Sequence, residues 1–445
     1  MTDTTTTAAP WLGVGRGRPE IGLPAVQIVD IIEDELRELP RSGYPIASAP
    51  IVVPRESYWD LLAANTRLLA LLRETVRHVG ADRAARMTAL GIDPADCPFF
   101  TSDDDFELRH CADMARADVL IGPDGPKFLE FNVSGAFGGL AHFQTYQRAW
   151  RRITELDGRL SFIAADPCAH EARLIESTCA ELGLPPEALL IGTPRDWGLD
   201  VSNRYFDVQV DSLRQHGVHV VHAEFDELPD LLDSSPWKVG IAGFTVQDAQ
   251  LVGYSLDPVG DAVDAGLLLI PSQSAWLLHT KRALALLSEE PDWLSTSDIE
   301  LVRRYVPWTR VLGDRRVSWQ GSESDLPELL IERQAEFVLK GATGWGGMEV
   351  FPGWTTPAAE WARLIDRALL VGSFVVQERV IAQQCPVDVL HEDGAVETVS
   401  AEAVISPFGI GGASAGCYVR FMDGAQVNPT VGGELAMRTC LLAES

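Results

Sequence analysis

Two runs of alternating polar and apolar residues meet at a Pro-Asp-Gly turn in the segment 113–134, DMARADVLIGPDGPKFLEFNVS. Proline presets the backbone angle of the first turn position, aspartate suits the second, and glycine tolerates a left-handed third. This order favours a three-residue hairpin loop with a bulge at Gly125. Pairing of Gly122 with Pro126 then fixes the register of an antiparallel hairpin, and the register decides which side chains share a face.

One face of this hairpin is predicted to be polar. Counted from the turn, its pairs are Leu120 with Phe128, Asp118 with Glu130 and Arg116 with Asn132. Directly opposed side chains have Cβ atoms about 5 Å apart. The other face is apolar and predicts a contact with the core; it carries Ala117, Val119, Ile121, Leu129, Phe131 and Val133.

The polar face has the composition of a cation site. Two directly opposed carboxylates repel each other, so Asp118 and Glu130 predict a cation between them. Together with the amide oxygen of Asn132 they form a hard-oxygen set that suits Mg²⁺. Arg116 adds a planar fork that fits a phosphate or a carboxylate. The sequence therefore predicts a metal and anion site on this face.

The alternative interpretation is a solvent-exposed polar surface on which the arginine neutralises the two acids. The residues that follow, 134–139 (SGAFGG), favour a ligand site, because small residues let a ligand approach the backbone closely. We therefore expect Ser134 and Gly135 to contact a substrate.

A glycine loop follows a predicted strand in EFVLKGATGWGGMEVF. The strand ends at Lys340, and Gly344, Gly346 and Gly347 follow before a second strand returns. Such a loop can bind phosphates through backbone N–H groups while the lysine supplies a positive charge. A plain glycine hairpin is the alternative, because the loop lacks the GK[ST] of a Walker motif and no helix follows it.

Three more segments of this half carry polar residues with two interpretations each. The segment FVVQERV has two interpretations, which concern Gln377, Glu378 and Val380. It either binds an adenine nucleoside with an apolar wall, backbone hydrogen-bonding groups and an acid for the ribose, or it is an ordinary strand end. In HTKRALALL, Lys281 is either a solvated helix residue or a second phosphate lysine. In GCYVRF, Arg420 is either strand surface or another anion contact.

Charge and cysteine usage exclude several classes of partner. With 36 basic against 64 acidic residues, the net charge of −28 argues against general binding to nucleic acid or to anionic membranes. No apolar run approaches the roughly 18 residues of a membrane span, and the first residues do not resemble a secretory signal. Seven scattered cysteines without a CxxC pair suggest free thiols in a reducing cytoplasm.

The spacing of these motifs resembles that of a known family. Arg116-Ala-Asp118 followed by Glu130-Phe-Asn132 is similar to the metal and phosphate site of the glutathionylspermidine synthetase-like ATP-grasp ligases. The elements of that family are circularly permuted, so the magnesium ligands precede the phosphate lysines, as they do here. The resemblance covers roughly residues 100–445 and the ligase domain only. The tryptophan in GWGG departs from the charged loop of the family. The tripeptide and polyamine substrates of the namesake enzyme are not implied.

The resemblance implies an ATP- and Mg²⁺-dependent carboxylate–amine ligase. Such an enzyme forms an amide or peptide bond through an acyl phosphate, here on a small-molecule or peptide acid and amine. The implied nucleotide contacts are Lys281, Lys340, Gly344, Gly346, Gly347, Gln377, Glu378 and Val380. The implied magnesium ligands are Asp118, Glu130 and Asn132, and the acyl phosphate would contact Arg116 and Arg420. The alternatives are an ATP-dependent small-molecule kinase and an inactive nucleotide-binding regulatory protein.

The predicted fold class is α/β, a circularly permuted ATP-grasp fold with a smaller pre-ATP-grasp-like α/β domain. Helices alternate with strands across 170–275, which argues for a parallel sheet. The expected divisions are a disordered lead at 1–20, a helical segment plus the metal-site hairpin at 21–165, the smaller α/β domain at 166–275 and the nucleotide-binding lobes at 276–445. A homodimer is left open.

Overall fold

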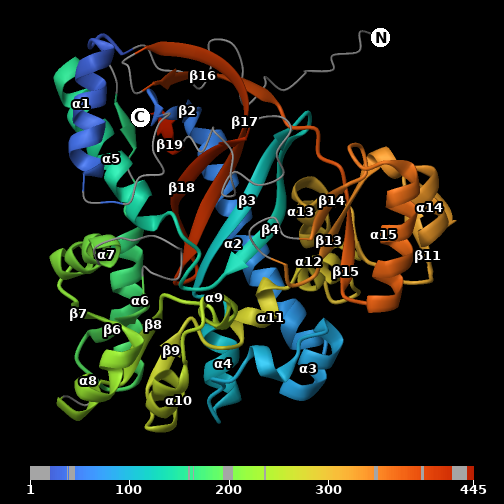
Figure 1. Ribbon diagram of the computed structural model, residues 1–445, viewed down its shortest axis with the longest axis horizontal. Helices are drawn as coiled ribbons and strands as arrows, with labels where there is room; N and C mark the ends of the chain where they lie inside the picture. The colour runs from blue at the N-terminus through green and yellow to red at the C-terminus, as the bar shows by residue number, and fades with distance from the viewer. Residues whose placement is uncertain are drawn as a thin grey trace.

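The computed structural model describes residues 21–37, 39, 46–158, 161–163, 165–193, 204–234, 237–344, 349–391, 395–422 and 438–444. Three sheets of four or more strands organise the chain (Figure 1). The largest has nine strands: β1 Ile46–Ala47, β2 Ile51–Val53, β3 Met114–Gly122, β4 Gly125–Val133, β5 Phe162–Ile163, β16 Gln384–Leu390, β17 Val396–Ile410, β18 Ala413–Met422 and β19 Arg438–Glu444. Its pairs are antiparallel except β19 with β2, and the long β17 pairs first with β16 and then with β3.

The main core lies between this sheet and a helical layer. That layer contains α2 Arg55–His78, α11 Ala275–His279, α12 Lys281–Ser288 and α13 Thr296–Tyr305. Leu61, Leu68 and Leu72 recur at helical spacing on α2 and are buried there, as the pattern of that segment predicts. Smaller helices α3 Arg83–Leu90 and α4 Asp104–His110 follow α2, with a 3₁₀ turn at Pro94–Asp96 between them.

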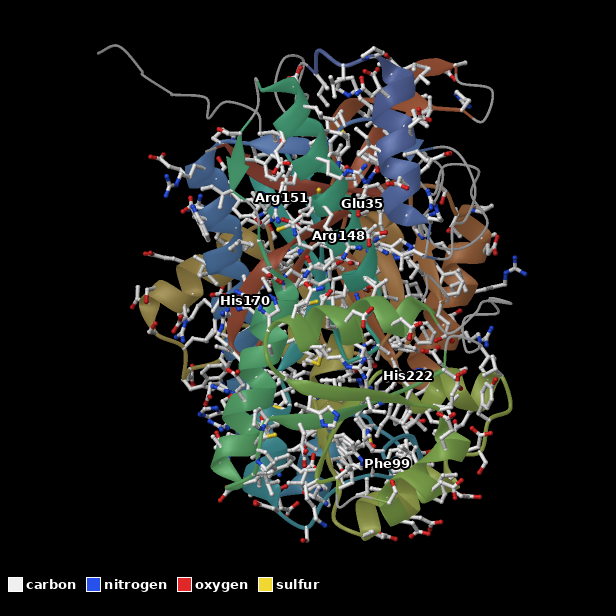
Figure 2. All side chains as sticks on the ribbon, turned by 90° about the vertical axis from the view of Figure 1, so that its left-hand side faces the viewer. Glu35, Phe99, Arg148, Arg151, His170 and His222 are labelled. Atoms are coloured by element: carbon white, nitrogen blue, oxygen red, sulfur yellow. The ribbon has the colours of Figure 1, made fainter. Side chains whose placement is uncertain are left out.

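The opposite face of the large sheet packs, over part of its area, on α1 Ala25–Leu36 and α5 Leu140–Asp157. These two helices lie side by side (Figure 1). Glu35 of α1 joins them by accepting from Arg148 (3.3 Å) and Arg152 (2.7 Å) of α5, and Figure 2 shows Glu35 beside Arg148. The polar side chains of the β3–β4 hairpin lie on the part of this face that α1 and α5 do not cover.

A parallel sheet in the order β7-β6-β8-β9 confirms the expectation from the helix–strand alternation. Its strands are β6 Glu187–Ile191, β7 His219–Ala223, β8 Val239–Ala242 and β9 Leu268–Ile270. Its helices are α6 Pro167–Glu181, α7 Arg204–Gln215, α8 Leu228–Ser234, α9 Val246–Leu251 and α10 Asp257–Asp264, with a 3₁₀ turn at Phe225–Glu227. The carboxyl end of β8 meets the hairpin, because a Cβ on Gly135 would lie 2.2 Å from the carbonyl oxygen of Ala242.

A third sheet, antiparallel in the order β10-β15-β13-β14, lies on the other side of the hairpin (Figure 1). Its strands are β10 Thr309–Val311, β13 Phe337–Gly341, β14 Val350–Pro352 and β15 Phe374–Glu378. It packs on α14 Leu326–Glu332 and α15 Ala358–Val371, next to a hairpin of β11 Arg316–Trp319 and β12 Ser322–Asp325 and a 3₁₀ turn at Gln334–Glu336. The predicted return strand after the glycine loop is confirmed as β14.

The register of the β3–β4 hairpin corrects the prediction near the turn. Gly122 pairs with Gly125 instead of Pro126, so the loop has two residues, although Gly125 does adopt a positive φ of 103°. Val119 therefore pairs with Phe128, and the predicted pairing of Leu120 with Phe128 is wrong.

A bulge at Leu129 then shifts the register by one residue. Asp118 pairs with Glu130 and Arg116 with Asn132, as predicted. The bulge turns Phe128 into the core, where it is completely buried, and sends Leu129 to the other face, so both were assigned to the wrong face.

Among the helices of the described residues, none is long and apolar enough to cross a membrane. The seven cysteines are all buried free thiols.

Candidate functional site

Three adjacent strands place a carboxylate beside two arginines on the face of the large sheet that is opposite α2. Asp118 of β3 accepts from Nη2 of Arg420 on β18 (2.6 Å) and from the hydroxyl of Ser406 on β17 (3.0 Å). The Nε atom of Arg116 lies 3.4 Å from the same oxygen, Oδ1. The alternation along each strand puts these four side chains on one face, opposite the face that packs on α2.

Electrostatics at this carboxylate favour its charged form. Burial opposes ionisation of Asp118, but Arg420 and Arg116 outweigh it and lower its pKa to about 2. The guanidinium of Arg116 is also held by the backbone, because its Nη1 donates to the carbonyls of Phe137 and Gly138 (3.3 Å to the latter). Burial and the neighbouring Arg420 lower the pKa of Arg116.

Glu130 has a separate pair of cations. Nζ of Lys281 lies 3.4 Å from its Oε2 and donates to the carbonyl of Gly344 at 2.5 Å. Lys281 is the first residue of α12 and is only 7% exposed, so it is not a solvated helix residue. Burial raises the pKa of Glu130, but Lys281 and Lys340 outweigh that effect and hold it below its ordinary value.

Lys340 of β13 is buried between the hairpin and the third sheet. Its Nζ donates to Oε1 of Gln377 at 2.8 Å. Burial lowers the pKa of Lys340 to about 8, although Glu130 opposes that shift. The amide group of Gln377 donates to the hydroxyl of Thr309 (3.0 Å) and to the carbonyl that the bulge exposes at Leu129 (3.1 Å). Gln377 thus fixes the ammonium group of Lys340 and connects the third sheet to the large sheet by a hydrogen bond.

Glu378 and Val380, the two other residues of the predicted adenine segment, do not contact the same groups as Gln377. Glu378 accepts from the indole of Trp319 (3.2 Å) and from the amide of Gln320 (3.4 Å), both in the neighbouring β11–β12 hairpin. Val380 packs with Leu120, Leu129, Ala382 and Val404 in a small apolar cluster next to the polar face. Gly346 and Gly347 lie outside the described residues.

These residues together make the site positive. Asp118 and Glu130 contribute two negative charges, and Arg116, Arg420, Lys281 and Lys340 contribute four positive ones. The site therefore carries an excess of two positive charges in a chain whose net charge is −28. A local excess of this sign attracts a polyanionic ligand.

The donor chemistry of the carboxylates fits a hard divalent cation. Across the described residues, every contact of Asp118 falls on Oδ1, and the one close contact of Glu130 falls on Oε2, so each has a second oxygen for a ligand. Asn132 uses its amide nitrogen to donate to the carbonyl of Arg116 at 3.3 Å, which orients its amide oxygen elsewhere. Within the described ranges, no three His, Cys, Asp or Glu side chains converge, so a metal here would rest on two carboxylates and this amide.

Ser134 and Gly135 stand at the end of β4, where the hairpin meets the parallel sheet. The hydroxyl of Ser134 accepts from the N–H of Ala136 at 2.8 Å, which closes a tight turn. Gly135 has no room for a side chain against Ala242, so its first role is the close approach of two backbones.

Sequence reasoning did not identify His279, which is 9% exposed and lies on α11 two residues before Lys281. Its ring stacks on Trp276 with centroids 4.5 Å apart. Burial and the charge of Lys281 lower its pKa to about 4, so the imidazole is neutral at pH 7. The sequence indicates a role for His279 only through its position in the segment HTK, two residues before Lys281.

Comparisons with known proteins bear on the fold. No family model matches the sequence, and no curated protein matches it. A solved structure of a glutathione synthetase-like effector from Globodera pallida, in its apo form, is 12% identical over 94% of this chain and 96% of that one, with a TM-score of 0.56. A protein from Methylobacillus flagellatus, provisionally described as a gamma-glutamylcysteine synthetase, is 13% identical over 86% of each chain, with a TM-score of 0.36. The described chain thus has a mixed α/β, glutathione synthetase-like fold.

Proposed function

We propose that this protein is an ATP- and Mg²⁺-dependent carboxylate–amine ligase of the circularly permuted ATP-grasp type. The observation that carries the proposal is the pair of opposed carboxylates, Asp118 and Glu130, with two arginines on one side and two lysines on the other. The excess of positive charge suits a triphosphate, and the free carboxylate oxygens suit a divalent cation.

The nucleotide would lie between the large sheet and the third sheet. Lys281 and Lys340 reach this space from different elements and are both buried, so their charges are little screened by water. Gly344, already held by Lys281, would lie beside the phosphates. The apolar cluster around Val380 supplies a wall for adenine. In this proposal residues 276–445 are the nucleotide-binding lobes and 166–275 the pre-ATP-grasp-like domain.

Asp118, Glu130 and Asn132 would hold the magnesium ion. When bound, the ion would neutralise charge on the phosphates during transfer. The two carboxylates stay ionised without it, since the cations beside them lower both pKa values. The site is therefore charged and ready for a metal at neutral pH.

The reaction would proceed in two displacements. A carboxylate oxygen of the acid substrate attacks the γ-phosphorus of ATP, and ADP leaves with the bonding pair. The amine then attacks the acyl carbon, phosphate leaves, and the nitrogen loses a proton, which gives the amide. Arg116 and Arg420 would hold the acyl phosphate and the oxyanion that forms on the acyl carbon. Their guanidinium groups are already fixed by backbone carbonyls and by Asp118.

A small-molecule kinase would use the same cluster for the first displacement alone. The two functions differ in the product, because a kinase releases a stable phosphorylated acid and a ligase releases an amide and phosphate. An inactive nucleotide-binding regulatory protein would do neither.

The proposal is tested by ADP release from MgATP in the presence of mixed L-amino acids. We expect Glu130→Gln to lower the rate at least 100-fold while the melting temperature stays within a few degrees of wild type, since Glu130 is partly exposed. Asp124→Asn is the matched control, because Asp124 is an exposed carboxylate on the same hairpin. A rate near wild type in Glu130→Gln, or no release by the wild type, would contradict the proposal.

A further inference from the structure

A buried hydroxyl lies inside the charged cluster, which consists of Asp118, Glu130, Arg116, Arg420, Lys281 and Lys340. The hydroxyl belongs to Ser406 of β17, a residue with no exposed surface. The strand β17 runs between β18, which carries Arg420, and β3, which carries Asp118. Ser406 therefore lies between a guanidinium and a carboxylate that the proposed function assigns to the ligand.

The hydroxyl of Ser406 donates and accepts at the same time. Its Oγ donates to Oδ1 of Asp118 at 3.0 Å and accepts from Nη2 of Arg420 at 3.2 Å. Nη2 of Arg420 also donates to Oδ1 of Asp118, at 2.6 Å. The three atoms thus form a closed triangle. A hydroxyl suits its third corner, because it carries both a donor and acceptor lone pairs.

The triangle leaves one polar atom of each charged partner outside it. In the described chain, every side-chain contact of Asp118 falls on Oδ1, and every hydrogen bond of the Arg420 guanidinium uses Nη2. The atoms left over are Oδ2 of Asp118 and Nη1 of Arg420. Neither belongs to the polar atoms that are buried without a partner, so both keep surface that a ligand can reach.

Removal of the hydroxyl would change how the two charges pair. Arginine and carboxylate groups favour a pair with two parallel contacts, in which two nitrogens meet both oxygens. Here the pair has one hydrogen bond, from Nη2 to Oδ1. Without the Ser406 hydroxyl, both groups would turn toward the two-contact arrangement. That arrangement occupies Oδ2 of Asp118, the oxygen that a divalent cation would need.

We propose that Ser406 is a positioning residue that keeps this charged pair open toward the ligand. It holds Asp118 and Arg420 in the one-contact pair, which leaves Oδ2 for a divalent cation and Nη1 for the anion that is transferred. This inference rests on the proposed ligase function. Ser406 itself would not touch a substrate, because its side chain is completely buried.

The test is Mn²⁺ binding to the full-length protein in the presence of ADP, measured by the electron paramagnetic resonance of free Mn²⁺. We expect Ser406→Ala to weaken Mn²⁺ binding about tenfold or more, the scale on which loss of a group that orients a metal ligand lowers affinity. Ser406→Thr keeps the hydroxyl on a residue that suits a strand, so its affinity should stay within about threefold of wild type.

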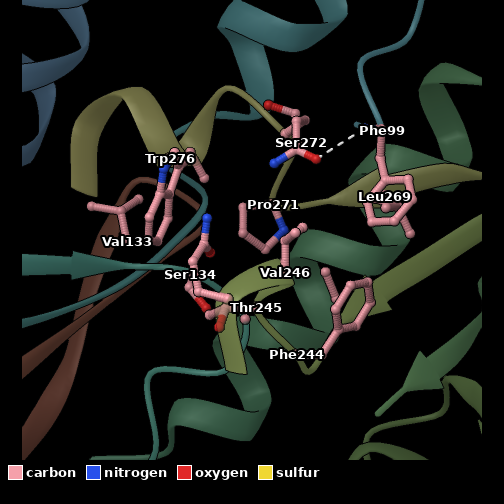
Figure 3. Close-up of a pocket in the computed structure, with 15 residues that line it drawn as sticks. Phe99, Val133, Ser134, Phe244, Thr245, Val246, Leu269, Pro271, Ser272 and Trp276 are labelled. Carbon is pink, nitrogen blue, oxygen red and sulfur yellow. Dashed lines mark hydrogen bonds between the residues drawn. The ribbon is translucent and has the colours of Figure 1, made fainter. Parts of the chain in front are cut away.

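The matched control is Ser272→Ala, which makes the same substitution at another buried serine. Ser272 is 3% exposed, and its hydroxyl donates to the backbone carbonyl of Glu107 at 2.7 Å. It lies just after β9, in the wall of a small cavity that no described residue of the charged cluster lines (Figure 3). Ser272→Ala should therefore lose a comparable hydrogen bond without a change in Mn²⁺ affinity.

The dependence of the rate on Mg²⁺ gives a second readout, which a mere loss of packing would not move. In the ADP-release assay, Ser406→Ala should need about tenfold more Mg²⁺ for its half-maximal rate, and saturating Mg²⁺ should recover part of the lost rate. Circular dichroism verifies the fold of each variant. Should Ser406→Ala fail to fold, Ser406→Cys replaces it, because a thiol has a similar shape but is a weak donor.

The outcomes separate this inference from the ligase proposal. Wild-type affinity for Mn²⁺ in Ser406→Ala, or an equal loss in Ser406→Thr or Ser272→Ala, overturns the role of Ser406 even if the enzyme forms amides. A loss in Ser406→Ala that Ser406→Thr restores, with no ADP released by the wild type, supports the role of Ser406 and contradicts the ligase. No saturable Mn²⁺ binding by the wild type contradicts both.

Discussion

Glu171 is a buried acid that the proposed chemistry does not use, and it makes the stability of the protein depend on pH. It lies on α6 with no exposed surface, and its Oε1 accepts from the amide of Gln209 on α7 at 2.7 Å. Its Oε2 is buried without a partner in the described part of the chain. Burial raises the pKa of Glu171 from 4.5 to about 7, against the opposing effect of Gln209.

The sign of the effect follows from proton linkage. Between pH 4.5 and 7 the unfolded chain has released this proton while the folded chain retains it, so the free energy of unfolding falls as pH rises. The gap between 4.5 and about 7, at about 1.4 kcal/mol for each pH unit, amounts to about 3 kcal/mol. Glu171→Gln removes the titration and keeps the oxygen that accepts from Gln209. We expect its free energy of unfolding, relative to wild type, to rise by about 2 to 3 kcal/mol between pH 5 and pH 8.

Hydrogen exchange of the α6 and α7 amides measures this difference, because intrinsic exchange rates cancel when two proteins are compared at one pH. Glu176→Gln is the control, since Glu176 is exposed on the same helix. Its difference from wild type should stay constant with pH. A constant difference for Glu171→Gln over the same range would show that Glu171 does not retain its proton in the folded protein.

Three further predictions concern the charged cluster. Asp118→Asn leaves two buried arginines without their carboxylate, so it should destabilise the protein by about 2–3 kcal/mol at pH 7 in urea unfolding; an unchanged midpoint would contradict this. Lys340→Met removes a buried cation and should weaken MgATP binding at least tenfold in a fluorescence titration. A Kd equal to that of wild type would mean that the glycine loop after Lys340 is a plain hairpin without a role in nucleotide binding. Arg116→Lys should keep ATP affinity within a few-fold but lower single-turnover amide formation by about 10²-fold, whereas a near-normal rate would make Arg116 a counter-ion for Asp118.

The pairing of the charged residues could be predicted from the sequence, but for a partly wrong reason. Alternation along the strands and the Pro-Asp-Gly turn gave the pairs Asp118–Glu130 and Arg116–Asn132. The turn is one residue shorter than predicted, and the bulge at Leu129 restores the register. A bulge on a strand with a partner on one side only depends on what the bulged residue contacts, here Gln377 of a distant strand, and no local pattern contains that.

The charge balance of the site could not be predicted from neighbouring residues. Opposed carboxylates alone predict that removing one relieves repulsion. In the folded chain Asp118 is held by Arg420, which is 302 residues away in sequence, and Glu130 by Lys281 of a different element. Because of the contact with Arg420, we expect removal of the Asp118 carboxylate to destabilise the protein, which is the opposite of what repulsion alone predicts. The topology that brings these residues together is not a property of any short segment.

Isotope tracing decides whether the protein is a ligase that acts through an acyl phosphate. The full-length protein is given MgATP and L-amino acids whose carboxylates carry ¹⁸O, and the products are measured by mass spectrometry. We expect an amide, one ADP for each amide, and one labelled oxygen in each phosphate released, because a carboxylate oxygen attacks phosphorus in the first step. A stable phosphorylated amino acid, AMP with pyrophosphate, or no consumption of ATP with any amino acid would contradict it.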